Sequence, residues 1–150
     1  MTIKPEQVGR NLHLTVEGID APFVIRPLPG RAGVQITDTY LKSMGGEVSP
    51  KDFTDALVMA VDGGVLDSFG RWVPLPEDQQ TNYARIGNEL SQAEAVTIIM
   101  PAFFWQTILG IDGVKAYIEG GEGLPGTLKA AGALTARLGL LTRRTSPHTA

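Results

Sequence analysis

The stretch from Ser91 to Gly121 constrains the fold most, because it holds the densest run of large apolar side chains in the chain. Ser91 and Glu94 form a Ser-x-x-Glu pattern, in which hydroxyl and carboxylate each satisfy a free backbone amide at a helix start. The apolar residues that follow occupy nearly every face of a helix. Such a helix must be enclosed by other elements or by other chains. The pattern predicts a central apolar helix over residues 92 to 109.

Three features are expected to interrupt this stretch. Pro101 lacks a backbone donor and is predicted to kink the helix or split it in two. Gly110 is predicted to end it, and Asp112 then caps a short helix that stops at Gly120-Gly121.

The N-terminal part alternates apolar and polar residues over positions 11 to 17, which is the period of a half-buried strand. A turn at residues 18 to 20 and a second β-favouring run at 23 to 25 predict a hairpin over residues 11 to 26, which Pro27 ends. An isolated hairpin is marginal in water. This one must therefore lie on the helices or join a sheet contributed by a neighbouring subunit.

Helical spacing predicts further helices over residues 34 to 44 and 50 to 62, and from Pro76 to Leu90. Residues 65 to 76 are predicted to form an ordered, partly buried loop anchored by Trp72. The segment from Gly123 on has four basic residues and no acidic one, and it predicts an amphipathic helix over 127 to 142 with a disordered end at 145 to 150. This helix either packs on its own domain, docks on a partner, or contacts a membrane or nucleic acid.

These patterns predict a mainly α fold with a short N-terminal β-hairpin, of the α+β class, with its helices packed around the helix at 92 to 109. Residues 1 to 122 form the helical domain, and residues 123 to 150 add a basic helix and tail that is not an independent domain. A chain of 150 residues is long enough for one substantial core.

Charge and composition exclude several classes of function. The net charge of −3 and a pI near 5.3 argue against nucleic acid or an anionic membrane as a partner. The absence of cysteine excludes disulfides and thiolate metal sites. The N-terminus has no apolar signal core, so we expect a soluble, cytoplasmic protein.

The search for chemistry finds no catalytic, cofactor or metal site. Gly121, Gly123 and Gly126 match the G-x-G-x-x-G spacing of dinucleotide sites, but no predicted strand leads into them. His13 and His148 are the only histidines, and neither has neighbours suited to a triad or a metal site. We therefore expect a protein that is not an enzyme and binds no cofactor.

Four segments follow one another in an order that resembles a known family. They are VEGIDAPFVIRPLP, GRAGVQITDTYL, LPEDQQTNYARIGNEL and AFFWQTILGIDGVKAYIEGG. The order is similar to that of the tail assembly chaperones of long-tailed bacteriophages of Actinobacteria, and the resemblance covers residues 10 to 121. It implies a non-enzymatic protein of the host cytoplasm that coats the helical, apolar tape measure protein during tail assembly. It also implies displacement of the chaperone before the virion is complete, self-association into a homo-oligomer, and a frameshifted longer form.

Such a chaperone needs more apolar surface than its own core uses, and we expect the middle helices to supply it. The residues predicted to contact the client or other subunits are Phe103, Phe104, Trp105, Tyr117, Leu134, Leu138 and Leu141. Two alternatives remain open. One is a structural phage protein, such as a head–tail connector or tail terminator, whose hairpin joins a ring-wide sheet. The other is a small-molecule-binding domain with a hidden pocket.

Overall fold

A computed structural model describes residues 3 to 145, and side chains from residue 3 to residue 140. The described residues form a mainly α, α+β fold, as the sequence predicts. The strands are β1 (Ile3–Val8), β2 (Asn11–Val16), β3 (Phe23–Ile25), β4 (Gly64–Leu66) and β5 (Trp72–Pro74). The helices are α1 (Gly30–Met44), α2 (Pro50–Asp62), α3 (Thr81–Glu89), α4 (Gln92–Trp105), α5 (Ile111–Glu119) and α6 (Gly123–Thr145), with a 3-10 turn η1 (Glu77–Gln79) before α3.

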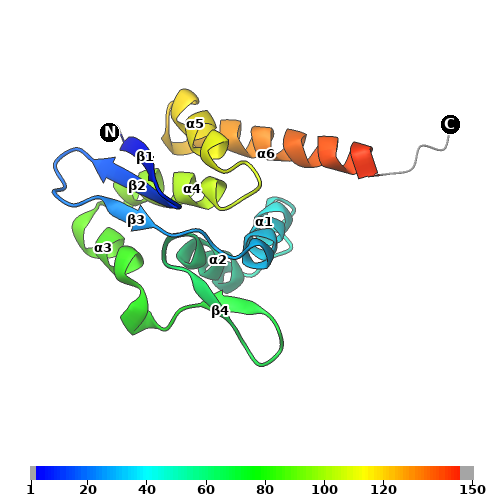
Figure 1. Ribbon diagram of the computed structural model, residues 1–150, viewed down its shortest axis with the longest axis horizontal. Coiled ribbons are helices and arrows are strands. Elements are labelled where there is room, and N and C mark those ends of the chain that lie inside the picture. Colours follow the sequence, from blue (N-terminus) through cyan, green and yellow to red (C-terminus); the bar gives the residue numbers. More distant parts are fainter. Residues whose placement is uncertain (1–2, 146–150) are drawn as a thin grey trace.

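Helix α4 lies at the centre of the molecule (Figure 1), which confirms the predicted arrangement. It packs against α2 and α3 on one side and against α5 and α6 on the other. The residues of α4 from 97 to 105 are buried, except for the partly exposed Ile99. The helix that is apolar on nearly every face is therefore enclosed by elements of its own chain.

The capping box at the start of α4 is present as predicted. The Ser91 amide donates to Glu94 Oε1 at 2.8 Å, and the Glu94 amide donates to Ser91 Oγ at 3.2 Å. Pro101 is predicted to kink the helix or split it in two, and the split does not occur, because α4 runs through Pro101 to Trp105. The helix ends four residues earlier than predicted, where the amides of Gln106 and Thr107 bond to carbonyls three residues back.

Replacing Ser91 by alanine is expected to lower the free energy of unfolding by about 1 kcal/mol, because it leaves an amide of the first turn without its acceptor. Urea denaturation of the purified chain measures this difference. Ser91→Asp keeps an acceptor at the same place and is expected to retain most of the stability. Equal stability of Ser91→Ala and the wild type would show that the capping box contributes nothing to the free energy of unfolding.

The N-terminal sheet contains the predicted hairpin. Strands β2 and β3 are antiparallel, with Leu12 opposite Ile25 and Leu14 opposite Phe23, and all four side chains are buried in the same core as the helices. The hairpin therefore lies on the helices of its own chain. Strand β1, which was not predicted, pairs with the other edge of β2. Its exposed polar residues and Pro5 carry no clear strand signal in the sequence.

Residues 64 to 74 correct another expectation, because they form a hairpin and not a loop. Strands β4 and β5 pair with Val65 opposite Val73, and the turn between them projects from the body beside α2 (Figure 1). Trp72 anchors the base of this hairpin, as predicted for the segment. Its amide donates to Gln35 Oε1 at 2.9 Å, and Gln35 Nε2 donates to its carbonyl at 2.7 Å.

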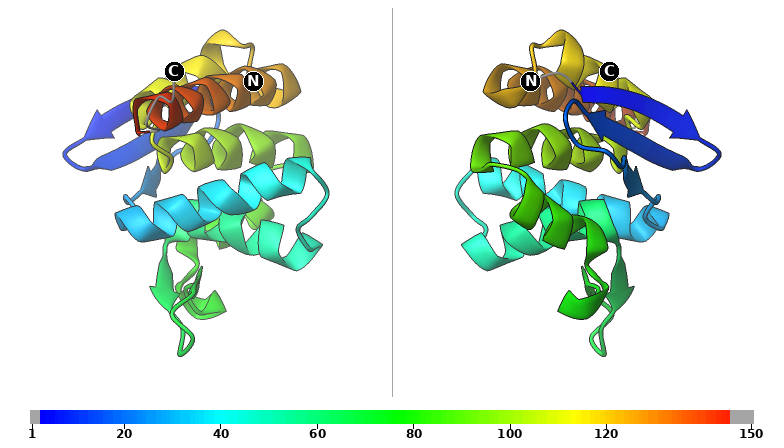
Figure 2. Two further views of the ribbon diagram at one scale, coloured as in Figure 1. Left: turned by 90° about the vertical axis from the view of Figure 1, so that its right-hand side faces the viewer. Right: turned by 90° about the vertical axis from the view of Figure 1, so that its left-hand side faces the viewer.

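Helix α6 is longer than the predicted range of 127 to 142 and packs along α5 and α4. In Figure 2 it lies at the end of the molecule opposite to the β4–β5 hairpin. Gly126 allows close packing on α5, because a Cβ there would lie 2.3 Å from the Tyr117 carbonyl oxygen. The predicted disordered end at residues 145 to 150 lies outside the described residues, apart from Thr145, which ends α6. No helix among residues 3 to 145 combines the length and apolar content that crossing a membrane requires.

Candidate functional site

Most of the residues predicted to bind a partner lie inside the protein. Phe103, Phe104, Tyr117 and Leu134 are 0% exposed, and Trp105 is 8% exposed. Their side chains face the interior of their own chain, and their contact with a client or another subunit stays a prediction. Leu138 is half-buried, and the side chain of the last predicted residue, Leu141, lies outside the described residues.

Each buried ring has its contacts within the chain. Phe103 and Phe104 pack edge to face with centroids 5.4 Å apart, and the Tyr40 ring of α1 lies tilted against Phe103 and edge to face with Phe104. Trp105 Nε1 donates to Gln7 Oε1 of β1 at 3.3 Å. The Tyr117 hydroxyl accepts from an amide at the start of α6 at 2.8 Å, and burial raises its pKa above the ordinary value. These aromatic residues of α1, α4 and α5 thus form part of the core of the monomer.

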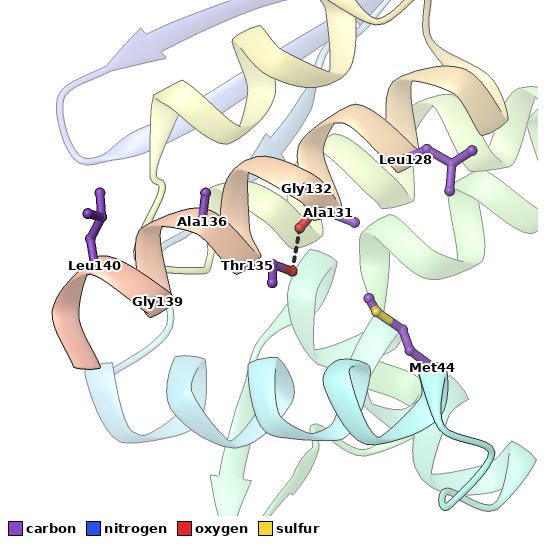
Figure 3. A pocket seen from close by; sticks show the side chains of 8 residues that line it. All are labelled: Met44, Leu128, Ala131, Gly132, Thr135, Ala136, Gly139 and Leu140. Carbon is purple, nitrogen blue, oxygen red and sulfur yellow. Dashed lines mark hydrogen bonds between the residues drawn. The ribbon is translucent and has the colours of Figure 1, made fainter. Parts of the chain in front are cut away.

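One apolar surface that remains exposed lies along α6. Leu128 is 64% exposed, and Leu140, more than three turns further along the helix, is 56% exposed. Between them lies a groove of about 800 Å³, which we call the α6 groove (Figure 3). Its lining residues are Met44 from α1 and Leu128, Ala131, Gly132, Thr135, Ala136, Gly139 and Leu140 from α6.

Two glycines on the floor of the α6 groove have no role in the packing of the monomer. A Cβ on Gly132 or Gly139 would meet nothing within 4 Å. Glycine in a helix interior costs roughly 1 kcal/mol relative to alanine. The two glycines are seven residues apart, so they lie on one face of α6. On that face the backbone of another helix can approach closely.

The chemistry of the α6 groove suits binding rather than reaction. Its only side-chain hydroxyl, on Thr135, donates to the Ala131 carbonyl at 2.9 Å and is thereby satisfied within α6. No histidine or carboxylate lines it. Lys129 and Arg137 reach toward Glu119 and Asp112 of α5 at 3.7 and 3.8 Å, and neither of these two basic residues lines the groove. An apolar segment without charges fits such a surface.

A second hollow of about 460 Å³ lies near the N-terminal half of α1, and we call it the α1 pocket. It is lined by Gly30, Gly33, Val34, Thr37, Asp38, Gln106, Thr107, Ile108 and Leu138. Gln106 builds its floor, since Oε1 accepts from the Leu28 amide at 2.9 Å and Nε2 donates to the carbonyls of Arg26 and Ala60. Val34 and Ile108 are exposed apolar residues at this pocket.

Sequence reasoning missed both hollows, because it relied on the largest side chains. The signal that could have located the α6 groove is the pair Gly132 and Gly139, which lowers helix propensity without ending the helix. No comparable signal marks Gln106, whose partners lie 46 to 80 residues away in sequence.

Within residues 3 to 145, no group of three or more histidine, aspartate or glutamate residues gathers where it could hold a metal ion. A comparison of the sequence with family models, with curated proteins and with solved structures finds no match to any of them.

Proposed function

We propose that this protein is an assembly chaperone that binds an apolar helical segment of a client protein in the α6 groove. In line with the family resemblance of the sequence, the client is the tape measure protein of a long-tailed phage, met in the host cytoplasm before the tail is complete. The observation that carries the proposal is an apolar groove of about 800 Å³ on the outer face of α6.

The shape of the groove favours a helix as the occupant. The distance along α6 from Leu128 to Leu140 is about 18 Å, given a rise of 1.5 Å per residue. This length matches about three turns of a client helix, which is more than the two turns that a set of i, i+3, i+4 and i+7 anchors needs. Gly132 and Gly139 leave room for the backbone of such a helix, while Leu128 and Leu140 contact its apolar side chains at either end.

The size of the groove also favours reversible binding. One groove of this length covers only a short segment of a client, so each copy binds weakly, with a dissociation constant on the order of micromolar. Several copies bound along one long client together hold it with high avidity, although each single copy binds weakly. A chaperone that is later displaced needs both high total avidity and weak binding by each copy.

The test uses a variant that fills the groove without disturbing the fold. Gly132→Trp places a large side chain on the groove floor, where a Cβ meets nothing within 4 Å. It is expected to raise the dissociation constant for the client at least about tenfold. The measurement is fluorescence anisotropy with a labelled helical fragment of the tape measure protein encoded in the same genome.

Gly87→Trp in α3 is the matched control, because a Cβ there also meets nothing within 4 Å and Gly87 does not line the groove. It is expected to bind the fragment as the wild type does. Equal affinity of Gly132→Trp and the wild type, or no binding by the wild type, contradicts the proposal. Recovery of the protein from purified virions would support the structural connector instead.

A further inference from the structure

The tip of the β4–β5 hairpin carries the most exposed large apolar side chain among the described residues. Phe69 is 92% exposed, and the neighbouring strand residues Val65 and Leu66 are exposed as well. The hairpin projects from the body on the side away from α6 (Figure 2). A large exposed aromatic residue at the end of a projecting element is typical of an interface anchor.

The turn holds Phe69 in a fixed position. Asp67 Oδ1 accepts from the amides of Phe69 and Arg71 at 2.8 and 2.9 Å, and the Asp67 amide donates to the Arg71 carbonyl at 2.8 Å. Gly70 supplies the positive φ of 78° that closes the turn. Because the turn is already ordered, binding through Phe69 loses little backbone entropy.

The α1 pocket has the properties that such a side chain requires. At about 460 Å³ it is larger than one aromatic ring, and Val34, Ile108 and Leu138 give it apolar walls. Asp38 adds one carboxylate to its lining. On the hairpin, Arg71 lies two residues from Phe69. Neither Asp38 nor Arg71 forms an ion pair with any residue that the structure describes.

We propose that Phe69 of one copy inserts into the α1 pocket of a second copy, with Arg71 of the first copy beside Asp38 of the second. Arg71 and Asp38 carry opposite charges, so the contact pairs these two groups as well as the apolar surfaces.

The positions of the two surfaces determine the kind of assembly. Phe69 is 92% exposed and is not among the residues that line the α1 pocket, so a chain does not fill its own pocket with its own Phe69. The contact is heterologous, and each added copy leaves one free hairpin and one free pocket. Copies therefore associate head to tail into a row or a ring. The proposal does not depend on whether the α6 groove binds a client.

The test measures the mass of the full chain by sedimentation over a range of concentrations, without any client. The wild type is expected to exceed the mass of a dimer as concentration rises. Phe69→Ser removes the side chain that inserts, and Val34→Lys places a cation in the pocket that repels Arg71. Each variant is expected to weaken association at least about tenfold, with an unchanged melting temperature because both positions are exposed.

Mixing the two variants gives the decisive result. Phe69→Ser retains an intact pocket and Val34→Lys retains an intact hairpin, so an equimolar mixture is expected to form a dimer and nothing larger. Gly132→Trp, which alters only the α6 groove, is expected to associate as the wild type does. A wild type that stays monomeric, association unaffected by Phe69→Ser, or a mixture that remains monomeric overturns the proposal.

Discussion

Replacing Phe103 by alanine is expected to lower the free energy of unfolding by about 3–5 kcal/mol, the largest effect of any substitution considered for this protein. The side chain is 0% exposed and touches two other rings, with centroids 5.0 Å from Tyr40 and 5.4 Å from Phe104. Its removal leaves a cavity at the centre of α4 and also eliminates these ring contacts. Because the free energy of unfolding of a small domain is only about 5–15 kcal/mol, this substitution removes a large part of it.

The matched control is Phe69→Ala, which makes the same chemical change on the surface. Since Phe69 is 92% exposed, this variant is expected to change the free energy of unfolding by no more than about 0.5 kcal/mol at a concentration where the chain is monomeric. Chemical denaturation followed by circular dichroism measures both values. Similar losses for the two variants would mean that the rings of α4 do not form the core of the monomer.

Replacing Gly126 by alanine is expected to lower the free energy of unfolding by about 2–3 kcal/mol, even though alanine is the better helix former. A Cβ at this position would lie 2.3 Å from the Tyr117 carbonyl oxygen and 3.1 Å from the Tyr117 ring. The first of these is a backbone atom, which a side-chain rotation cannot move away. Helix α6 must therefore shift away from α5 and lose part of its buried contact.

Gly132→Ala is the control in the same helix. A Cβ there meets nothing within 4 Å, so only the helix propensity changes, and the variant is expected to gain about 0.5–1 kcal/mol. The same denaturation experiment measures both variants. Opposite signs for the two substitutions are the expected result, and a stabilised Gly126→Ala would show that α5 and α6 do not pack as closely as described.

The parts of the fold that the sequence predicts well are those determined by local chemistry. The capping box at Ser91 and the Ser49 cap of α2, which accepts from the Asp52 amide at 3.2 Å, depend on residues three positions apart. Alternation over residues 11 to 16 likewise predicts a strand. In each case the side chains that decide the structure are close in sequence.

The parts that the sequence did not predict depend on distant contacts. Strand β1 is held by pairing with β2, and β5 is held by Gln35 through two hydrogen bonds across 37 residues. Pro101 stays inside α4, and its side chain is buried in the interior of the protein. Tertiary packing determines these features, and no pattern of neighbouring residues in the sequence predicts them.

The candidate site was missed for a related reason. A large apolar side chain is expected to be buried away from water, but its size does not tell whether it is buried in the core of its own chain or in an interface with a partner. The rings of α4 entered the core because the sheet, α1 and α2 bring enough apolar surface to enclose them. The apolar surfaces that remain for partners are the groove along α6, where small residues such as Gly132 and Gly139 give little signal in the sequence, and the exposed Phe69 with the α1 pocket.

The central claim is that this outer face of α6 contacts a helical client while α4 stays enclosed. Photo-crosslinking tests it most directly, with a photoreactive amino acid placed at position 128 in the groove or at position 96, an exposed apolar position on α4. The account predicts that the tape measure fragment is joined to the chain from position 128 and not from position 96. Crosslinks from position 96 alone, or equal yields from both positions, would contradict it.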